Sequence, residues 1–418
     1  MKLIKETKHT KQKAQTKVNV VDSIMGSGKT SWAIQYMNNA DSDRNFIYIT
    51  PFLDEVKRVK DSVTNRKFIA PVNKGKGKLD NLKKLIINEN DIVSTHALFQ
   101  NADAELIELL KISNYTLILD EAMNVVDQFP LDKDDFKLLI HNQMVSIEES
   151  TGLVRWNNES AYQNTAYNDL KNLAKTENLY FFENTILFWT FPVTTFKAFE
   201  EVYILTYLFQ AQQQKYYYDM YNLEYSYKVV EKLNETYVLV NYESRNPYDK
   251  TALKALITIY EGKLNNIGEA DYSLSKSWFD KAKNRDIVLK LKKNIYSYFK
   301  NNLKSPAKLN MWTCFKNDIP KLKGEGYTKG FVPCNARATN DYKEKEFLAY
   351  PVNRFMNPYE KKFFVAKGAE VNQDLFALSE LLQWIWRSRI REGKPINLYI
   401  PSNRMRNILL QYLQNDKL

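Results

Sequence analysis

Residues 18–30 constrain the fold more than any other stretch of this chain. The β-branched run at residues 18–21 predicts a buried strand, and Gly26 and Gly28 allow a tight loop after it. Residues 31–37 are compatible with a helix whose N-terminus would point its dipole back at that loop. Strand, glycine loop and helix in this order predict an α/β fold with a phosphate-binding loop at the edge of a parallel sheet.

The side chains of this loop suit a nucleoside triphosphate with Mg²⁺. Lys29 supplies a mobile cation for the β- and γ-phosphates, and Thr30 supplies a hydroxyl for the metal. The general phosphate-loop pattern has glycine where this chain has Ser23. A chance Gly-Lys-Thr in a surface loop is the alternative, and the strand–loop–helix order disfavours it. The residues expected to bind the nucleotide are Ser23, Gly26, Ser27, Gly28, Lys29 and Thr30.

Composition limits the class of protein. With 418 residues the chain can form two or three domains, and 44% apolar residues indicate a globular protein. The cysteines, Cys314 and Cys334, lie far apart, which suits a reducing, cytoplasmic setting. The apolar stretch 186–209 contains Lys197 and two glutamates, which argues against a membrane span. The net charge of +11 suits a polyanionic partner.

A second chemical motif follows a predicted strand. Apolar runs predict strands at residues 45–50, 91–94 and 115–119. Strands that alternate with helices indicate a parallel sheet, whose ligands bind at the carboxyl ends of the strands. Asp120 and Glu121 end the last of these runs, so we expect them near the phosphate loop. Asp120 is the candidate metal ligand, and Glu121 is the candidate to orient and activate the attacking water.

The remainder of the chain predicts a second α/β lobe. We place the boundary near residue 222, after a basic tail (1–17) and a first lobe (18–221). Further strands are predicted in the second lobe at residues 309–315, 330–333 and 398–401. The Lys-rich segment 275–303 is either a helical insertion that contacts nucleic acid or a solvated helical face. The run Tyr216–Tyr218 is either a base-stacking platform or, as we favour, core.

The second lobe has an arginine-rich landmark at residues 383–391. Helical spacing places Gln383, Arg387 and Arg391 on one face. Arg387 is the candidate arginine finger, which would stabilise charge at the γ-phosphate, with a solvated helix C-terminus as the alternative.

These stretches resemble, in order, the motifs of superfamily 2 helicases. The stretches that resemble these motifs are 23–30, Thr50-Pro51, Ser94-Thr95-His96, the Asp-Glu-Ala-Met tetrad at 120–123 (similar to DEAD and DEAH boxes), Thr206-Tyr207, 335–340 and 383–391. The set is also similar to small bacteriophage replication helicases related to origin-binding helicases. The resemblance implies two RecA-like lobes, ATP with Mg²⁺ in the cleft between them, and single-stranded nucleic acid across the top. It also implies a second arginine after Arg387, which would be Arg389 or Arg391, and helical geometry favours Arg391.

The same resemblance implies a set of nucleic-acid contacts. These are Thr50, Pro51, Thr95, His96, Thr206, Arg337 and Thr339. Thr206 would lie in the turn that couples hydrolysis to lobe movement, with Thr190 as the alternative.

Three functions remain open at this level. The first is an ATP-dependent DNA helicase or translocase, with DNA as partner. The second is a viral DNA-packaging ATPase, which needs a C-terminal nuclease with clustered carboxylates, whereas residues 375–418 are rich in arginine. The third is a non-enzymatic nucleic-acid binder or loading factor. The presence of Lys29, Thr30, Asp120 and Glu121 disfavours the third reading.

Overall fold

The computed structural model describes residues 15–158, 166–244, 250–334 and 341–414. The chain divides into two compact units. Unit 1 comprises Met1–Ser23, Gly28–Thr206 and Gln213–Val240, and unit 2 comprises Ile24–Ser27, Tyr207–Gln212 and Asn241–Leu418. Within the described part of the chain, no helix combines the length and apolar character needed to cross a membrane.

Unit 1 is built on a seven-stranded sheet with the order β12-β11-β1-β10-β4-β2-β3. Its strands are β1 (Lys17–Asp22), β2 (Asn45–Thr50), β3 (Ile92–Thr95), β4 (Tyr115–Asp120), β10 (Glu201–Thr206), β11 (Ser226–Leu233) and β12 (Thr236–Asn241). From β11 through β3 all neighbouring strands run parallel. The carboxyl ends of these strands therefore meet at one edge.

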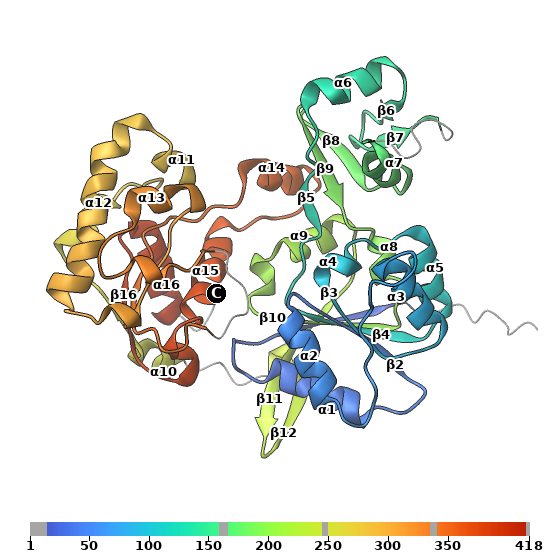
Figure 1. Cartoon of the computed structure of the whole chain (residues 1–418), viewed down its shortest axis with the longest axis horizontal. Helices are drawn as coiled ribbons and strands as arrows, with labels where there is room; N and C mark the ends of the chain where they lie inside the picture. The colour runs from blue at the N-terminus through green and yellow to red at the C-terminus, as the bar shows by residue number, and fades with distance from the viewer. Residues whose placement is uncertain (1–14, 159–165, 245–249, 335–340, 415–418) are drawn as a thin grey trace, which may run out of the picture. The chain divides into compact units, whose positions relative to one another are not determined.

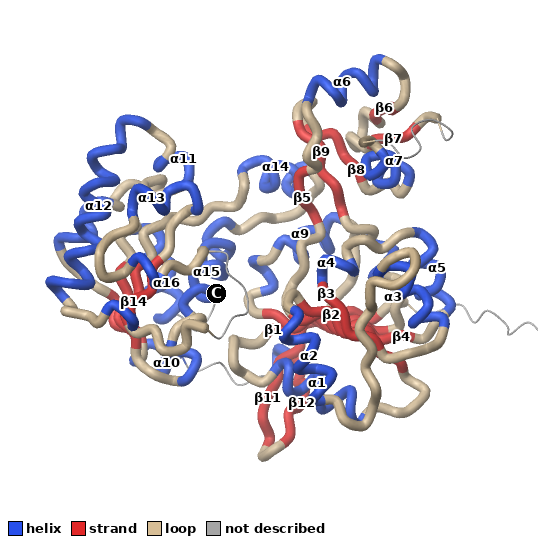
Figure 2. The backbone as a smooth tube through the Cα atoms, in the orientation of Figure 1, coloured by secondary structure: helices blue, strands red, loops and turns tan. Residues whose placement is uncertain are grey.

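The central strands are apolar throughout because both faces of the sheet are covered. In β4 the residues from Tyr115 to Leu119 are all buried, including Thr116. Such a continuous run is typical of a parallel strand buried on both faces. The helices of unit 1 are α1 (Lys29–Asn39), α2 (Leu53–Ser62), α3 (Lys78–Ile87), α4 (His96–Phe99), α5 (Ala104–Ile112), α8 (Val193–Phe196) and α9 (Gln213–Met220). Figure 2 shows the strands gathered together with these helices around them.

A small antiparallel region is inserted between β4 and β10, and we call it the inserted segment (126–190). It contains β5 (Val126–Gln128), α6 (Lys133–His141), β6 (Val145–Ile147), β7 (Val154–Trp156), α7 (Asn168–Lys175), β8 (Leu179–Phe182) and β9 (Ile186–Thr190). The sheets β5-β9-β8 and β6-β7 are antiparallel. Its own core includes Phe136, Leu139 and Leu170. Figure 1 shows these elements grouped together.

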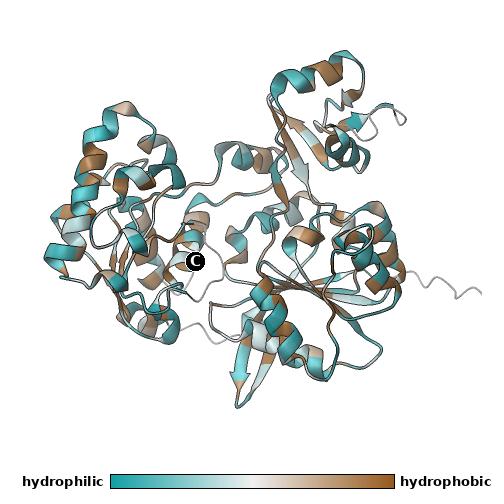
Figure 3. Cartoon of the chain, in the orientation of Figure 1, coloured by the Kyte–Doolittle hydropathy of each residue, from teal (hydrophilic) through white to brown (hydrophobic). Residues whose placement is uncertain are grey.

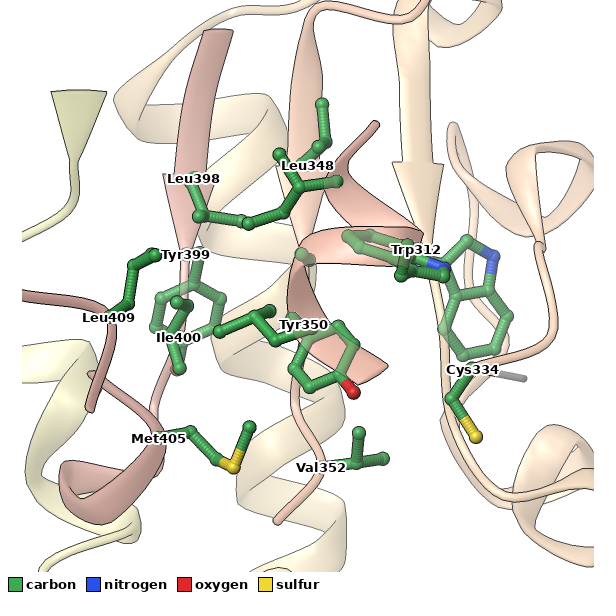
Figure 4. Packing of buried hydrophobic residues seen from close by; sticks show 14 of the residues in the cluster. Trp312, Cys334, Leu348, Tyr350, Val352, Leu398, Tyr399, Ile400, Met405 and Leu409 are labelled. Atoms are coloured by element: carbon green, nitrogen blue, oxygen red, sulfur yellow. The ribbon is translucent and has the colours of Figure 1, made fainter. Parts of the chain in front are cut away.

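Unit 2 contains a four-stranded sheet of order β13-β16-β15-β14, parallel throughout. Its strands are β13 (Ile257–Ile259), β14 (Asn310–Trp312), β15 (Phe347–Ala349) and β16 (Ile396–Tyr399). Its helices are α10 (Lys250–Ala255), α11 (Lys276–Phe279), α12 (Arg285–Ser297), α13 (Ile319–Leu322), α14 (Pro358–Ala366), α15 (Gln373–Ile385) and α16 (Asn403–Gln414). Figure 4 shows Leu348, Tyr350 and Leu398 in the core with Met405 and Leu409 of α16.

The predicted fold class, α/β with two parallel sheets, is confirmed. The predicted boundary near residue 222 is wrong, because β11 pairs with β1 and unit 1 continues to Val240. The strand expected at 330–333 is absent from the described residues, where only an isolated bridge joins Phe331 to Trp312. Residues 186–190 form β9, which lies outside the main sheet.

Two helical predictions are resolved by burial. The segment 275–303 includes α12, whose Val288, Leu291 and Ile295 lie in the core of unit 2, while its lysines face outward. The alternating colours of α12 in Figure 3 show this amphipathic pattern. The helix is therefore part of the core of unit 2 and carries a solvated lysine face, and contact of these lysines with nucleic acid stays a prediction. Tyr216–Tyr218 are fully buried, which confirms the core reading.

Candidate functional site

The loop between β1 and α1 has the backbone expected of a phosphate loop. Gly26 and Gly28 have φ angles of 83° and 96°, in the left-handed region that other residues enter at a cost in free energy. The Ser27 N–H donates to the Ile24 carbonyl at 3.2 Å and closes the turn. Helix α1 begins at Lys29, so its first N–H groups are available to an anion.

Lys29 lies inside the loop that it is expected to serve. Its Nζ donates to the Ser23 carbonyl at 2.5 Å. The ammonium group therefore spans the loop from the start of α1 to the end of β1. Thr30 follows it in the first turn of α1 and is partly exposed. This arrangement suits the predicted roles of Lys29 toward phosphate and of Thr30 toward Mg²⁺.

Ser23 has a structural reason to replace the glycine of the general pattern. The residue is 5% exposed, and its hydroxyl accepts a hydrogen bond from the Val230 N–H at 2.9 Å. Its own N–H donates to the Thr206 carbonyl at 3.0 Å. A glycine would leave the Val230 N–H of β11 without this acceptor, so Ser23 joins the start of the loop to two neighbouring strands.

Tyr237 of β12 contacts the other end of the loop. A Cβ placed on Gly28 would lie 2.1 Å from the Tyr237 Cε1, so only glycine fits beneath the ring. The Tyr237 N–H donates to the Gln35 side chain at 2.9 Å, and the Gln35 amide donates to the Glu235 carbonyl at 3.3 Å. The sequence analysis missed this contact, because β11 and β12 were assigned to the other lobe.

Strand register brings the second motif to the same edge as the loop. Asp22 pairs with Thr206, and Leu205 pairs with Asp120, so β10 lies between the strand of the loop and the strand of the acidic pair. The Glu121 N–H donates to the Leu205 carbonyl at 3.0 Å. The expected proximity is therefore present within unit 1, between the acidic pair and Ser23 and Lys29 on either side of the glycine turn.

Asp120 lies in a crowded acidic environment. Burial, with the carboxylates of Glu121 and Glu55, raises the pKa of Asp120 to about 7. The Tyr48 hydroxyl and the Lys29 ammonium act in the opposite direction. A carboxylate under such repulsion is suited to a divalent cation, and Mg²⁺ prefers oxygen ligands while keeping several waters. Asp120 and the Thr30 hydroxyl therefore fit as the donors to Mg²⁺.

Glu121 has a strained backbone at this site. Its φ angle is 72°, in the left-handed region, which a residue with a long side chain rarely adopts. Such outliers persist only where the surrounding structure holds them, and they cluster at functional sites. The strain therefore agrees with a specific placement of the Glu121 carboxylate next to Asp120.

The predicted nucleic-acid contacts differ in their exposure. Thr50 and Thr206 are 0% and 2% exposed, so their side chains are buried at the ends of β2 and β10. Pro51, Thr95 and His96 are partly exposed, and the His96 Nε2 lies 3.1 Å from the Asp120 carbonyl. His96 therefore lies beside the acidic pair, which the sequence analysis did not anticipate. Arg337 and Thr339 lie outside the described residues.

Of the two threonines considered for the coupling turn, Thr206 belongs to the main sheet, where it ends β10 opposite Asp22. Thr190 is in β9, and its Oγ1 lies 2.9 Å from the Tyr221 hydroxyl. Its place outside the main sheet favours Thr206 for the coupling turn, and that assignment stays a prediction.

The candidate arginines of unit 2 do not share one helical face. Helix α15 ends at Ile385, and Arg389–Glu392 form a separate short 3₁₀ turn. The helical argument for Arg391 is therefore wrong, although Arg391 itself is exposed.

Arg387 and Arg389 are both at least partly buried within unit 2. Arg387 is only 8% exposed. Arg389 forms an ion pair with Glu346 and donates to the Pro395 carbonyl at 2.5 Å. The Gln383 amide donates to the Ser379 hydroxyl at 3.3 Å. Their catalytic roles stay predictions.

The fold and the site together define an α/β protein with a phosphate-loop strand–turn–helix and an acidic pair at one sheet edge. Residues 251–413 match the family described as YonV C-terminal Rossmann-like domain, and residues 126–189 match the YonV middle domain. A Bacillus subtilis (strain 168) protein, described as SPbeta prophage-derived uncharacterized protein YonV, is 48% identical over 413 residues, which cover 96% of this chain and 100% of the relative. The chain belongs to the YonV family.

Two solved structures are similar to this chain over most of its length. S. tokodaii Xpd4 has 11% sequence identity and a TM-score of 0.49, with 95% of this chain and 94% of that chain covered. A structure titled XPD helicase has 10% identity and a TM-score of 0.42, with the same coverage of 95% and 94%. TM-scores below 0.5 do not establish a shared fold.

Proposed function

We propose that this protein is an ATP-dependent DNA helicase or translocase with two RecA-like lobes, of the superfamily 2 type. The observation that carries the proposal is the meeting of Lys29, Asp120 and Glu121 at one sheet edge, where the charge of Lys29 acts on Asp120. Phosphoryl transfer to water needs these three groups in one place. The prophage description of the 48% identical relative supports a role in phage DNA replication or recombination, in the host cytoplasm.

Each group at this edge has a distinct task in the proposal. Lys29 and the N-terminus of α1 bind the phosphates of ATP. Asp120 and Thr30 hold Mg²⁺, which would neutralise charge on the β- and γ-phosphates when bound. Glu121 orients the attacking water and accepts its proton, and its constrained backbone fixes where the carboxylate lies.

The proposal assigns nucleic-acid binding to both units. The net charge of +11 suits a DNA backbone, and the motif order of superfamily 2 implies single-stranded DNA as the partner. Arg387 of unit 2 is the proposed arginine finger, which would make hydrolysis depend on DNA. Binding that depends on backbone phosphates should weaken with salt and vary little with sequence.

The decisive experiment measures ATP hydrolysis with and without single-stranded DNA. We expect hydrolysis by the wild-type chain that DNA stimulates, and loss of that hydrolysis in Lys29→Ala. Lys111→Ala is the matched control, because Lys111 pairs with Glu108 on the surface of α5. Hydrolysis at the wild-type rate by a folded Lys29→Ala variant would contradict the site, and hydrolysis that ignores DNA would contradict the helicase assignment.

A further inference from the structure

Unit 2 offers a candidate for a second binding site, formed by none of the candidate site residues named above. A cavity of about 400 Å³ is lined by Asp271, Tyr272, Phe355, Asp374, Asn403, Arg404, Asn407, Ile408 and Gln411. Cavities of this size accept small organic molecules. We call it the Tyr272 pocket.

The Tyr272 pocket lies at the edge of the sheet where ligands bind in open α/β folds. Tyr272 follows β13, Phe355 follows β15, and Asn403 follows β16. These three strands are adjacent and parallel, so their carboxyl ends share one edge. Ligands of such folds bind in the crevice outside this edge.

Flat groups are stacked within the pocket. The Tyr272 and Phe355 rings are stacked with centroids 5.6 Å apart and planes inclined by 27°. The Arg404 guanidinium lies 4.1 Å from the centre of the Phe355 ring. Tyr272 is nevertheless 72% exposed, so most of an apolar ring faces solvent. Stacked aromatic and guanidinium groups with an open face are suited to another flat ring.

The exposed ring is held in place by a buried network. Asn353 is 1% exposed, and its amide donates to the Asp271 and Ser273 carbonyls on either side of Tyr272, at 2.7 and 3.1 Å. Arg404 donates to the Asn353 Oδ1 at 2.8 Å. The loop therefore presents Tyr272 to solvent in a fixed position, which lowers the entropy lost when a ring stacks on it.

The charges of the pocket favour a base over a phosphate. Asp374 pairs with Arg404 at 2.7 Å, and the Asp271 carboxylate also lines the pocket, so an anion would meet two carboxylates. Exocyclic amino groups of a nucleobase can donate to carboxylates. The exposed Asn407 and Gln411 amides offer both donors and acceptors from one face of α16.

From these observations we infer that the Tyr272 pocket stacks a nucleobase of single-stranded DNA. The inference rests on the proposed function for its choice of DNA over other sources of a flat nitrogen heterocycle. Stacking on an aromatic side chain tolerates any base, which suits an enzyme that moves along DNA without reading its sequence.

Oligonucleotides with and without bases test the inference. We expect Tyr272→Ala to weaken binding of a normal single strand by about tenfold, within the range known for loss of one base stack. An abasic strand of equal length should bind the wild type and the variant equally, because it keeps every phosphate. Tyr272→Phe should keep the affinity. Tyr359→Ala is the matched control, since Tyr359 is 44% exposed on α14 outside the pocket.

A base analogue supplies a readout that a loss of folding cannot imitate. The fluorescence of 2-aminopurine in the strand should be quenched on binding to the wild type and to Tyr272→Phe, but not on binding to Tyr272→Leu. If Tyr272→Ala binds both strands as the wild type does, the inference alone is wrong. If the wild type binds no strand, the inference fails together with the DNA part of the proposed function. A different result would assign the pocket to a free nucleotide. In that case free deoxyadenosine monophosphate would displace the strand, and the wild type would bind the normal and the abasic strand equally.

Discussion

At the scale of single residues, the backbone conformation of Glu121 bears most directly on its proposed role as general base. The residue has a φ angle of 72°, a backbone conformation that costs free energy and that the surrounding structure must hold. Glu121→Gln should therefore keep Mg²⁺-ATP binding, because Lys29, Thr30 and Asp120 remain, while turnover falls by roughly two or more decades for loss of a general base. Nucleotide affinity and turnover measured on the same preparation check this.

A comparison variant separates the two acids. Asp120→Asn removes the proposed metal ligand, so it should weaken nucleotide binding only when Mg²⁺ is present. Equal losses of binding and turnover in Glu121→Gln would contradict the division of roles between Glu121 and Asp120.

Ser23 gives a prediction that opposes the motif pattern. Ser23→Gly restores the glycine of the general phosphate loop but leaves the buried Val230 N–H without its acceptor. An unsatisfied buried donor costs roughly 1–3 kcal/mol, so we expect a lower melting temperature despite the better match. Ser27→Ala is the control, because the Ser27 hydroxyl makes no hydrogen bond within the described part of the chain. Unchanged melting of Ser23→Gly would show that the contact is dispensable.

At the scale of elements, the β11–β12 pair acts on the phosphate loop through Tyr237. The Cβ added by Gly26→Ala has no atom within 4 Å, so the variant should lose stability only through its positive φ angle, by about 1–2 kcal/mol. Gly28→Ala should lose the same amount for its φ angle. Its Cβ would also clash with the Tyr237 ring, which should lower the free energy of unfolding by about 1–3 kcal/mol more. Adding Tyr237→Ala to Gly28→Ala should recover that second part, as a double-mutant cycle in urea denaturation would measure. Equal effects of the two glycine variants would place the ring elsewhere.

Elements also explain which parts of the fold the sequence could predict. The strand at residues 45–50 was predictable because buried parallel strands are apolar without interruption. The inserted segment was missed because strands such as β6 and β7 are three residues long and half exposed. β11 was assigned to the wrong unit. Its alternation of exposed and buried residues does not indicate which strand it pairs with, and its partner in the sheet is β1, about 200 residues earlier in the chain.

The candidate site divides in the same way. The position of Lys29, Asp120 and Glu121 was predictable because each motif directly follows a predicted strand. The carboxyl ends of those strands meet at one edge of a parallel sheet. Tyr237 was not, since its contact with Gly28 joins residues far apart in the chain. The helical argument for Arg391 failed because nothing in the local sequence indicates that α15 ends at Ile385.

At the scale of the whole molecule, the proposal requires each unit to contribute one part of the chemistry. Arg387→Ala should keep ATP binding, since the phosphate loop is intact, while hydrolysis falls by about three decades, the usual worth of an arginine finger. Stimulation by DNA should be lost with it. The measurement is turnover at saturating ATP, with and without a single strand.

Two controls keep this prediction interpretable. Arg387 is mostly buried, so a melting curve must show that the variant is folded. Arg354→Ala breaks the ion pair with Glu380 in the same unit and should lower stability without a comparable loss of turnover. DNA-stimulated hydrolysis at the wild-type rate in Arg387→Ala would leave unit 2 without a catalytic part.

The inserted segment also bears on how such a chain can be edited. Its first and last strands are partners, with Val126 opposite Thr190, so the chain leaves and returns at neighbouring points. Opposed residues of an antiparallel pair lie only about 4.5–5.5 Å apart. A short turn can therefore bridge that gap at little entropic cost, while β4 and β10 keep their register. We therefore expect that replacing residues 127–189 by a short turn leaves the seven-stranded sheet of unit 1 folded.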